Sequence, residues 1–118
     1  MDLLGIDNVF FEVGDLEMAV TLYQRLGFPL RFKIPHIQGA LFSIGREEPG
    51  LLLRERATPV PAKLWIEVVS AREAQMLFQE GTMMETATGW TFEVSDPWGN
   101  RVGFADYTKK RELARRQT

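Results

Sequence analysis

The stretch IDNVFFEVGDLEMAVTLYQRLGF, residues 6–28, joins an apolar, β-prone run to an amphipathic pattern. Residues 6–13 lie between two glycines and are rich in strand-forming residues, which is typical of a β-strand. Asp15 can cap a helix, and one buried stripe is predicted from the i, i+3, i+4, i+7 spacing of Ala19, Leu22, Tyr23 and Leu26. Gly27 occupies the place of a left-handed residue that ends a helix. The stretch therefore predicts a strand followed by a helix.

A similar stretch, AKLWIEVVSAREAQMLFQEGTMM, returns about fifty-five residues later as residues 62–84. It has a strand-like run at 63–69, a capping box at SARE, a stripe of Ala74, Leu77 and Phe78, and Gly81 to end the helix. Three short strands are expected after each helix, at 30–34, 40–44 and 51–55 in the first half and at 83–86, 89–95 and 101–107 in the second. The repetition predicts an α+β fold of two tandem βαβββ modules.

The boundaries follow from this repeat and from turn residues. We expect a single domain over residues 1–118, with module one at 1–57, a proline-containing linker at 58–62, module two at 63–107 and a basic C-terminal tail at 108–118. In the turn SDPWGN, Asp96 can accept a bond from an amide two residues on, and Gly99 or Asn100 tolerates positive φ. This turn is predicted to be structural and to carry no chemistry.

Composition restricts the classes of function. The 118 residues are 45% hydrophobic and 25% charged, as in globular proteins. The absence of cysteine excludes disulfides and thiolate chemistry and suits the cytoplasm, where we expect the protein; no signal peptide or membrane span is predicted. The tail carries about +4 of charge and the remainder about −6, so a solvated tail and no nucleic-acid partner are expected.

Alternation along the two first strands separates the residues that face the helix from those that face away. Val9, Phe11 and Val13 should face the first helix, and Leu64, Ile66 and Val68 the second. The opposite faces then carry Asn8, Phe10 and Glu12 in module one and Lys63, Trp65 and Glu67 in module two. If these faces met only solvent, Phe10 and Trp65 would leave large aromatic surfaces wet. We therefore predict a concavity or an interface on these faces.

The segment FFEVGDLEMAVTLYQRLGF, residues 10–28, and the late segment SDPWGNRVGF, residues 95–104, resemble motifs of the vicinal oxygen chelate superfamily, which includes glyoxalases, bleomycin resistance proteins and extradiol dioxygenases. The resemblance covers residues 6 to about 107. It implies that the modules form a mixed, curved sheet with the helices on its convex face. It also implies, for many members, a divalent metal that polarises two neighbouring substrate oxygens.

The metal-ligand positions that the resemblance implies are substituted in this chain. The two histidine positions fall on Asn8 and Lys63, and the late glutamate position falls on Gly103; the matching position in module one falls near Leu52 or Arg54. The sequence thus predicts no functional metal site and no cofactor, unless atypical ligands such as Glu12 and Glu67 replace the usual ones. The single histidine, His36, is expected on a surface loop.

We therefore expect a small-molecule-binding protein that resembles the bleomycin-resistance branch and forms a homodimer, with no membrane partner. A cleft between the modules is expected to hold a flat or extended ligand, and no catalytic residue is assigned. The predicted ligand-binding residues are Asn8, Phe10, Glu12, Lys63, Trp65, Glu67, Trp90 and Trp98. The sequence leaves two alternatives open: a metal-dependent lyase, isomerase or dioxygenase with atypical ligands, and a dimerising structural or regulatory partner.

Overall fold

The structure, a computed structural model, describes residues 1–2, 4 and 6–116. The chain divides into two compact units. Unit 1 comprises residues 1–62 and 96–100, and unit 2 comprises residues 63–95 and the described residues from 101 onward. Each unit has one four-stranded mixed sheet and one α-helix, so the predicted α+β fold of two tandem βαβββ modules is confirmed. Neither helix is long and apolar enough to cross a membrane, within the residues described.

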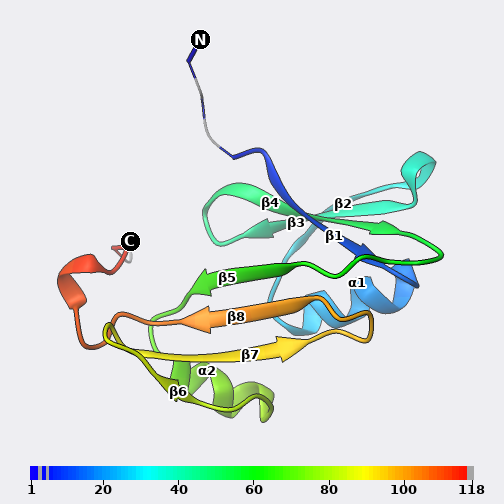
Figure 1. The fold of residues 1–118 in the computed structure, drawn as a ribbon. Coiled ribbons are helices and arrows are strands. Elements are labelled where there is room, and N and C mark those ends of the chain that lie inside the picture. The colour runs from blue at the N-terminus through cyan, green and yellow to red at the C-terminus, as the bar shows by residue number, and fades with distance from the viewer. Residues whose placement is uncertain (3, 5, 117–118) are drawn as a thin grey trace. The chain divides into compact units, whose positions relative to one another are not determined.

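Unit 1 contains the first strand–helix pair and three further strands. Its elements are β1 (Asn8–Val13), α1 (Leu16–Arg25), β2 (Leu30–Ile34), a 3₁₀ turn (Pro35–Ile37), β3 (Gly39–Ile44) and β4 (Glu47–Glu55). The strand order is β1-β4-β3-β2, with β1 parallel to β4 and the other pairs antiparallel (Figure 1).

The core of unit 1 forms between α1 and one face of this sheet. Asp15 caps the helix by accepting a 3.0 Å hydrogen bond from the Met18 amide, and Gly27 follows its end with a φ of 99°, both as predicted. Phe11 and Val13 are fully buried, and the Phe11 ring meets the Tyr23 ring edge-on at 6.1 Å. The predicted assignment of these side chains to the helix face is therefore confirmed.

Unit 2 repeats the arrangement. Its elements are β5 (Lys63–Glu67), α2 (Ala71–Phe78), β6 (Met84–Glu85), β7 (Trp90–Ser95), β8 (Arg101–Ala105) and a 3₁₀ turn (Arg111–Leu113). The order is β5-β8-β7-β6, with β5 parallel to β8 and the other pairs antiparallel (Figure 1). The core rings are Phe78 from α2, Phe92 from β7 and Phe104 from β8, with Phe92 and Phe104 stacked at 5.0 Å.

Two predictions for α2 are wrong. Leu77 is 82% exposed instead of buried, and the helix ends at Phe78 with Gln79, not Gly81, in the left-handed conformation that follows it. The reason is the anchor at the start of the helix: the Ala71 amide donates to the buried Asp106 carboxylate at 2.7 Å. This bond sets the rotation of the helix, so that Ala71 and Phe78 face the sheet and Leu77 lies on the flank.

The turn between β7 and β8, Asp96–Asn100, belongs to unit 1 and contains several hydrogen bonds. The Asp96 carboxylate accepts from the Tyr23 hydroxyl at 2.9 Å, from the Trp98 amide at 2.9 Å, and from the amide and side chain of Asn100. The Asn100 side chain also donates to the Glu12 carbonyl at 2.7 Å. The predicted amide bond to Asp96 and the positive φ at Gly99 are both confirmed.

Candidate functional site

In each unit the helix covers one face of the sheet; we call the other face the open face. On the open face of unit 2, the strand register aligns three rows of side chains. One row is Trp65, Gly103 and Glu93, and a second is Lys63, Arg101 and Ser95; the third is Glu67, Ala105 and Thr91. Since β8 lies between β5 and β7, its small residues Gly103 and Ala105 occupy the middle of this face.

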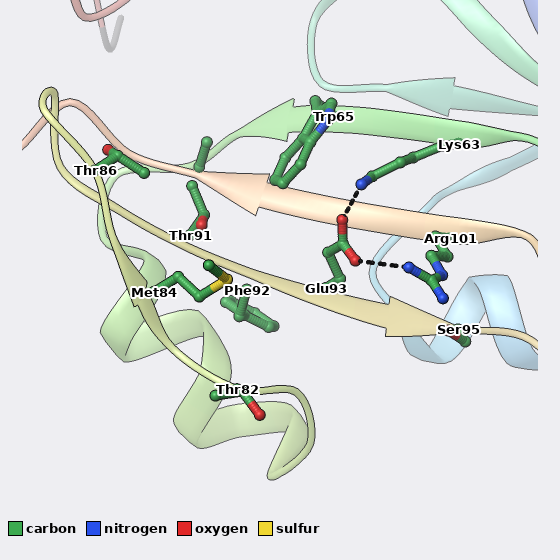
Figure 2. Close-up of a pocket in the computed structure, with 11 residues that line it drawn as sticks. Lys63, Trp65, Thr82, Met84, Thr86, Thr91, Phe92, Glu93, Ser95 and Arg101 are labelled. Carbon is green, nitrogen blue, oxygen red and sulfur yellow. Dashed lines mark hydrogen bonds and ion pairs between the residues drawn. The ribbon is translucent and has the colours of Figure 1, made fainter.

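Small side chains in the middle and longer ones at the sides leave a groove of about 740 Å³ on this face (Figure 2). This volume is in the range of small-molecule sites. Its apolar lining includes Trp65, Met84 and Ala105, and its polar lining consists of charged and hydroxyl side chains: Lys63, Thr82, Thr86, Thr91, Glu93, Ser95 and Arg101. We refer to this feature as the unit 2 groove.

The Trp65 indole lies directly over Gly103. A methyl group at position 103 would be 2.3 Å from Cε3 of the indole, which is far below any van der Waals contact. Trp65 is nevertheless 50% exposed, so the indole rests on the sheet while part of its surface remains available to a ligand. Glycine at 103 is therefore the residue that allows an aromatic platform at this position.

Beside this platform, two cations share one carboxylate. Lys63 Nζ pairs with one oxygen of Glu93, and Arg101 Nη1 lies 3.5 Å from the other (Figure 2). Lys63 Nζ also lies 4.8 Å from the centre of the Trp65 ring, within cation–π distance. Lys63, Glu93 and Arg101 are the charged side chains among the described residues that line the groove.

Of the residues predicted to bind ligand, the structure brings Lys63 and Trp65 into the unit 2 groove. Glu67 lies on the same open face but lines a separate hollow of about 140 Å³ near the C-terminal tail. There its carboxylate accepts from the Arg115 backbone amide at 2.8 Å and from the Arg115 guanidinium at 2.7 Å. Glu67 is thus held by the basic tail.

The other first strand, β1, places Asn8, Phe10 and Glu12 on the open face of unit 1. Asn8 lines a hollow of about 530 Å³ in this unit and donates to the Asp7 carboxylate at 2.9 Å. The Glu12 carboxylate accepts from the Val60 amide at 2.9 Å and from Arg56 Nε at 3.3 Å, so it fastens the linker to β1. Phe10 is 40% exposed.

The two remaining tryptophans have partners within their own units. The Arg72 guanidinium lies 3.9 Å from the centre of the Trp90 ring, and Lys109 Nζ lies 5.5 Å from it. The Trp98 indole packs on Gly14, where an added methyl group would lie 2.3 Å from its nitrogen. The predicted surface position of His36 is confirmed: it is exposed in the turn Pro35–Ile37.

The residues at the implied metal-ligand positions do not fit a divalent metal. Gly103 offers no donor and is covered by the Trp65 indole, and the Lys63 ammonium is ion-paired to Glu93. In unit 1 the register pairs Leu52 with Phe10 and Arg54 with Glu12, and neither Leu52 nor Arg54 is a metal ligand. Among the residues that the structure describes, no three His, Cys, Asp or Glu side chains gather in a group that could hold an ion.

Sequence reasoning missed several lining residues of the groove, notably Thr91, Glu93 and Arg101. A signal for them was present. Strands are expected over 89–95 and 101–107. Alternation groups Thr91, Glu93 and Ser95 on one side of the first of these strands, and it groups Arg101, Gly103 and Ala105 on one side of the second. The parallel pairing of β5 with β8 then brings these faces beside Lys63 and Trp65.

Comparisons with solved structures find the same fold. TnmS3, an antibiotic binding protein from Streptomyces sp. CB03234, is similar with a TM-score of 0.79 and 20% identity over 92% of this chain and 99% of that one. A lactoylglutathione lyase from Agrobacterium tumefaciens has a TM-score of 0.73 and 18% identity over 90% and 96% of the two chains. The bleomycin-binding protein of Streptomyces verticillus, in complex with copper(II)-bleomycin, has a TM-score of 0.67 and 21% identity over 90% and 98%.

No protein-family model matches the sequence, and no curated protein sequence is significantly similar to it. The likeness is therefore one of fold. It confirms the fold that the two sequence motifs indicated.

Proposed function

Since the chain has the fold of the glyoxalase/bleomycin resistance protein/dioxygenase superfamily, we propose that it binds a small molecule in the unit 2 groove and does so without a metal. One observation carries the proposal: the Trp65 indole lies over Gly103, within a groove of about 740 Å³. The indole occupies the space that a metal-binding side chain at position 103 would need. It offers an aromatic surface for a flat group in place of a Lewis acid.

The solved structures with this fold include both binding proteins and a lyase, so the fold alone favours neither class. The side chains of this chain favour binding. Hard-metal chemistry needs several oxygen or imidazole donors. Of the implied positions Asn8, Lys63 and Gly103, only Asn8 offers such a donor, its amide oxygen.

The proposal can be tested with naphthamide, an uncharged flat aromatic probe, in an NMR titration. The chain has three tryptophans, so an isotope-labelled sample gives three indole N–H signals, which Trp→Phe variants assign. We expect naphthamide to shift the Trp65 signal and to leave the Trp90 and Trp98 signals in place. The Trp65→Ala variant should lose binding, while Trp98→Phe should retain it.

Other outcomes distinguish the alternatives. Shifts that persist in Trp65→Ala would place the probe elsewhere and contradict the proposal. One equivalent of a divalent metal retained by the purified protein would instead support the metal-dependent enzyme. Absence of any titratable change at Trp65, together with tight self-association, would support the structural partner.

We also propose that the chain forms a homodimer through the open face of unit 1. The register of that sheet aligns four apolar side chains across all its strands: Phe10, Leu52, Leu41 and Phe32. Phe10 is 40% and Phe32 50% exposed, and β1 is an edge strand of the sheet. An apolar row beside an unpaired edge is a surface that a second copy can cover.

A further inference from the structure

The charges of the unit 2 groove are unequal. Lys63 and Arg101 are positive, Glu93 is negative, and these are the charged groups among its described lining residues. Both cations point to the same carboxylate, the Lys63 ammonium directly and the Arg101 guanidinium at 3.5 Å (Figure 2). One carboxylate therefore serves two cations, and the groove retains about one positive charge.

We propose that the ligand of this groove is a flat aromatic molecule that carries an anionic group, such as a carboxylate, sulfonate or phosphate. Its ring lies against the Trp65 indole, and its anionic group binds Lys63 and Arg101. This inference rests on the proposed function and names the class of ligand for the same site.

The donor count favours an anion over a cation. An ammonium has three N–H donors and a guanidinium has five, so Lys63 and Arg101 together can serve more acceptors than the Glu93 carboxylate supplies. Both side chains are also accessible, with 44% of Lys63 and 58% of Arg101 exposed. A cationic ligand would have to compete with two cations for one carboxylate, whereas an anionic ligand would find two partly occupied donors.

The second carboxylate on this open face does not change that balance. Glu67 lies two residues from Trp65 on β5, but its two oxygens accept from the amide and guanidinium of Arg115. Its side chain is 15% exposed, compared with 28% for Glu93. A ligand on Trp65 therefore meets Lys63, Glu93 and Arg101 as its charged neighbours.

The position of the two cations also fits a planar ligand. Lys63 Nζ lies over the Trp65 ring, 4.8 Å from its centre, so an anion bound to it is close to an aromatic group that packs on the exposed part of the indole. In the row beyond, Ala105 and Thr91 are small and leave room for the body of the molecule, and Met84 adds an adaptable apolar wall.

The test uses three probes that share one aromatic body and differ in charge: naphthoate, naphthamide and naphthylmethylammonium. Binding is followed through the Trp65 indole N–H signal at low ionic strength. We expect naphthoate to bind about tenfold more tightly than naphthylmethylammonium, which corresponds to the gain from two exposed ion pairs. Added salt should reduce this preference.

Three variants of the charged residues in the groove assign the effect. Lys63→Met and Arg101→Met should each weaken the binding of naphthoate several-fold and leave the affinity for naphthamide unchanged. Glu93→Gln should strengthen naphthoate, because it removes the carboxylate that competes for both cations. Circular dichroism and the unmoved signal of Trp90, which lies in unit 2, show that each variant is folded.

The outcomes separate this inference from the proposed function. If all three probes shift Trp65 with equal affinity, the groove binds aromatic molecules but the inference about charge is wrong. If naphthylmethylammonium binds most tightly and Glu93→Gln abolishes its binding, Glu93 recognises a cation and the inference is overturned. If no probe shifts Trp65, the proposed function fails together with the inference.

Discussion

The indole of Trp65 and the Cα of Gly103 face each other across the parallel pair of β5 and β8, and they are so close that no side chain fits between them. This relationship links two unrelated-looking features of the sequence. One is an exposed tryptophan on a first strand, and the other is a glycine in the middle of a last strand. Each requires the other, because a larger residue at 103 would displace the indole and a smaller residue at 65 would leave the glycine uncovered.

The pair predicts a strong coupling between the two positions. Gly103→Ala should lower the free energy of unfolding by about 1–3 kcal/mol, because the new methyl group overlaps the indole. It should also weaken naphthamide binding at Trp65. In the Trp65→Ala background the same substitution should be neutral, or stabilising by up to about 1 kcal/mol, since alanine suits a strand better than glycine does.

A double-mutant cycle with urea unfolding measures this coupling. Equal effects of Gly103→Ala in the two backgrounds would mean that the indole yields without cost, and the proposed platform would lose its rigidity. The matched control is Ala105→Ser on the same face of β8, which should show no coupling to position 65.

The hydrogen bond from the Ala71 amide to the Asp106 carboxylate, at the start of α2, should weaken in acid. Burial tends to raise the pKa of its carboxyl, but hydrogen bonds from the Ala71 amide, the Trp90 amide and Thr108 outweigh burial and hold the pKa below its ordinary value. A lowered pKa in the folded state means that the stabilisation is complete above about pH 4 and is lost as the pH falls through the folded pKa. Unit 2 should therefore lose stability in acid through this group.

The substitution Asp106→Asn should lower the free energy of unfolding by about 2 kcal/mol near neutral pH. The reason is that the new –NH₂ group would face the Ala71 N–H or leave one of the other donors unpaired. The gap between the variant and the wild type should narrow as the pH is lowered. Urea unfolding from about pH 7 to about pH 3 follows both chains. A constant gap over this range would show that the ionised carboxylate is not the stabilising form, and the exposed Asp2→Asn variant serves as the control.

Tyr23 should make the stability of the protein fall at high pH, the opposite of the effect of Asp106. Burial, and then the negative charge of Asp96, raise the pKa of its phenol above the ordinary value. A raised pKa in the folded state means that the stabilisation is complete below about pH 10 and is lost as the pH rises above that point. The wild type should thus lose stability in alkali through Tyr23.

Tyr23→Phe should lower the free energy of unfolding by about 2 kcal/mol at neutral pH, since it removes the 2.9 Å hydrogen bond to the buried Asp96 carboxylate. It should also remove this alkaline loss of stability. Tyr107→Phe is the matched control, because the chain has two tyrosines. An alkaline unfolding curve that is unchanged in Tyr23→Phe would contradict the assignment.

The sequence allowed the repeat, both first strands and the aromatic side of each to be predicted, because those features depend on local periodicity. The contacts that form the groove were harder to predict from the sequence. Glu93 and Arg101 lie on strands that were expected, but their approach to Lys63 depends on the register of β5 against β8, which is set by packing across the sheet. Leu77 was assigned to the core because periodicity fixes the spacing of a stripe and not its rotation, which the bond from Ala71 to Asp106 determines.

The tail illustrates the same limit. Its charge predicted a solvated segment, and residues 109–116 are exposed, but charge did not predict that Arg115 binds Glu67 over a separation of 48 residues. Charge composition cannot specify such a partner, because any exposed carboxylate would satisfy a surface arginine equally well. A position-specific contact of this kind requires the folded path of the chain.

The apolar row on unit 1 predicts self-association that added charge should weaken. Phe10 and Phe32 lie at the two ends of the row formed with Leu52 and Leu41. We expect Phe10→Glu and Phe32→Glu each to weaken dimerisation at least tenfold, because each would place a charge in an apolar interface. Sedimentation velocity over a range of concentrations measures this, with Met76→Glu, at an exposed apolar position of α2, as the charge-matched control. A concentration-independent monomer in the wild type would contradict the proposed dimer, and equal weakening by Met76→Glu would place the interface elsewhere.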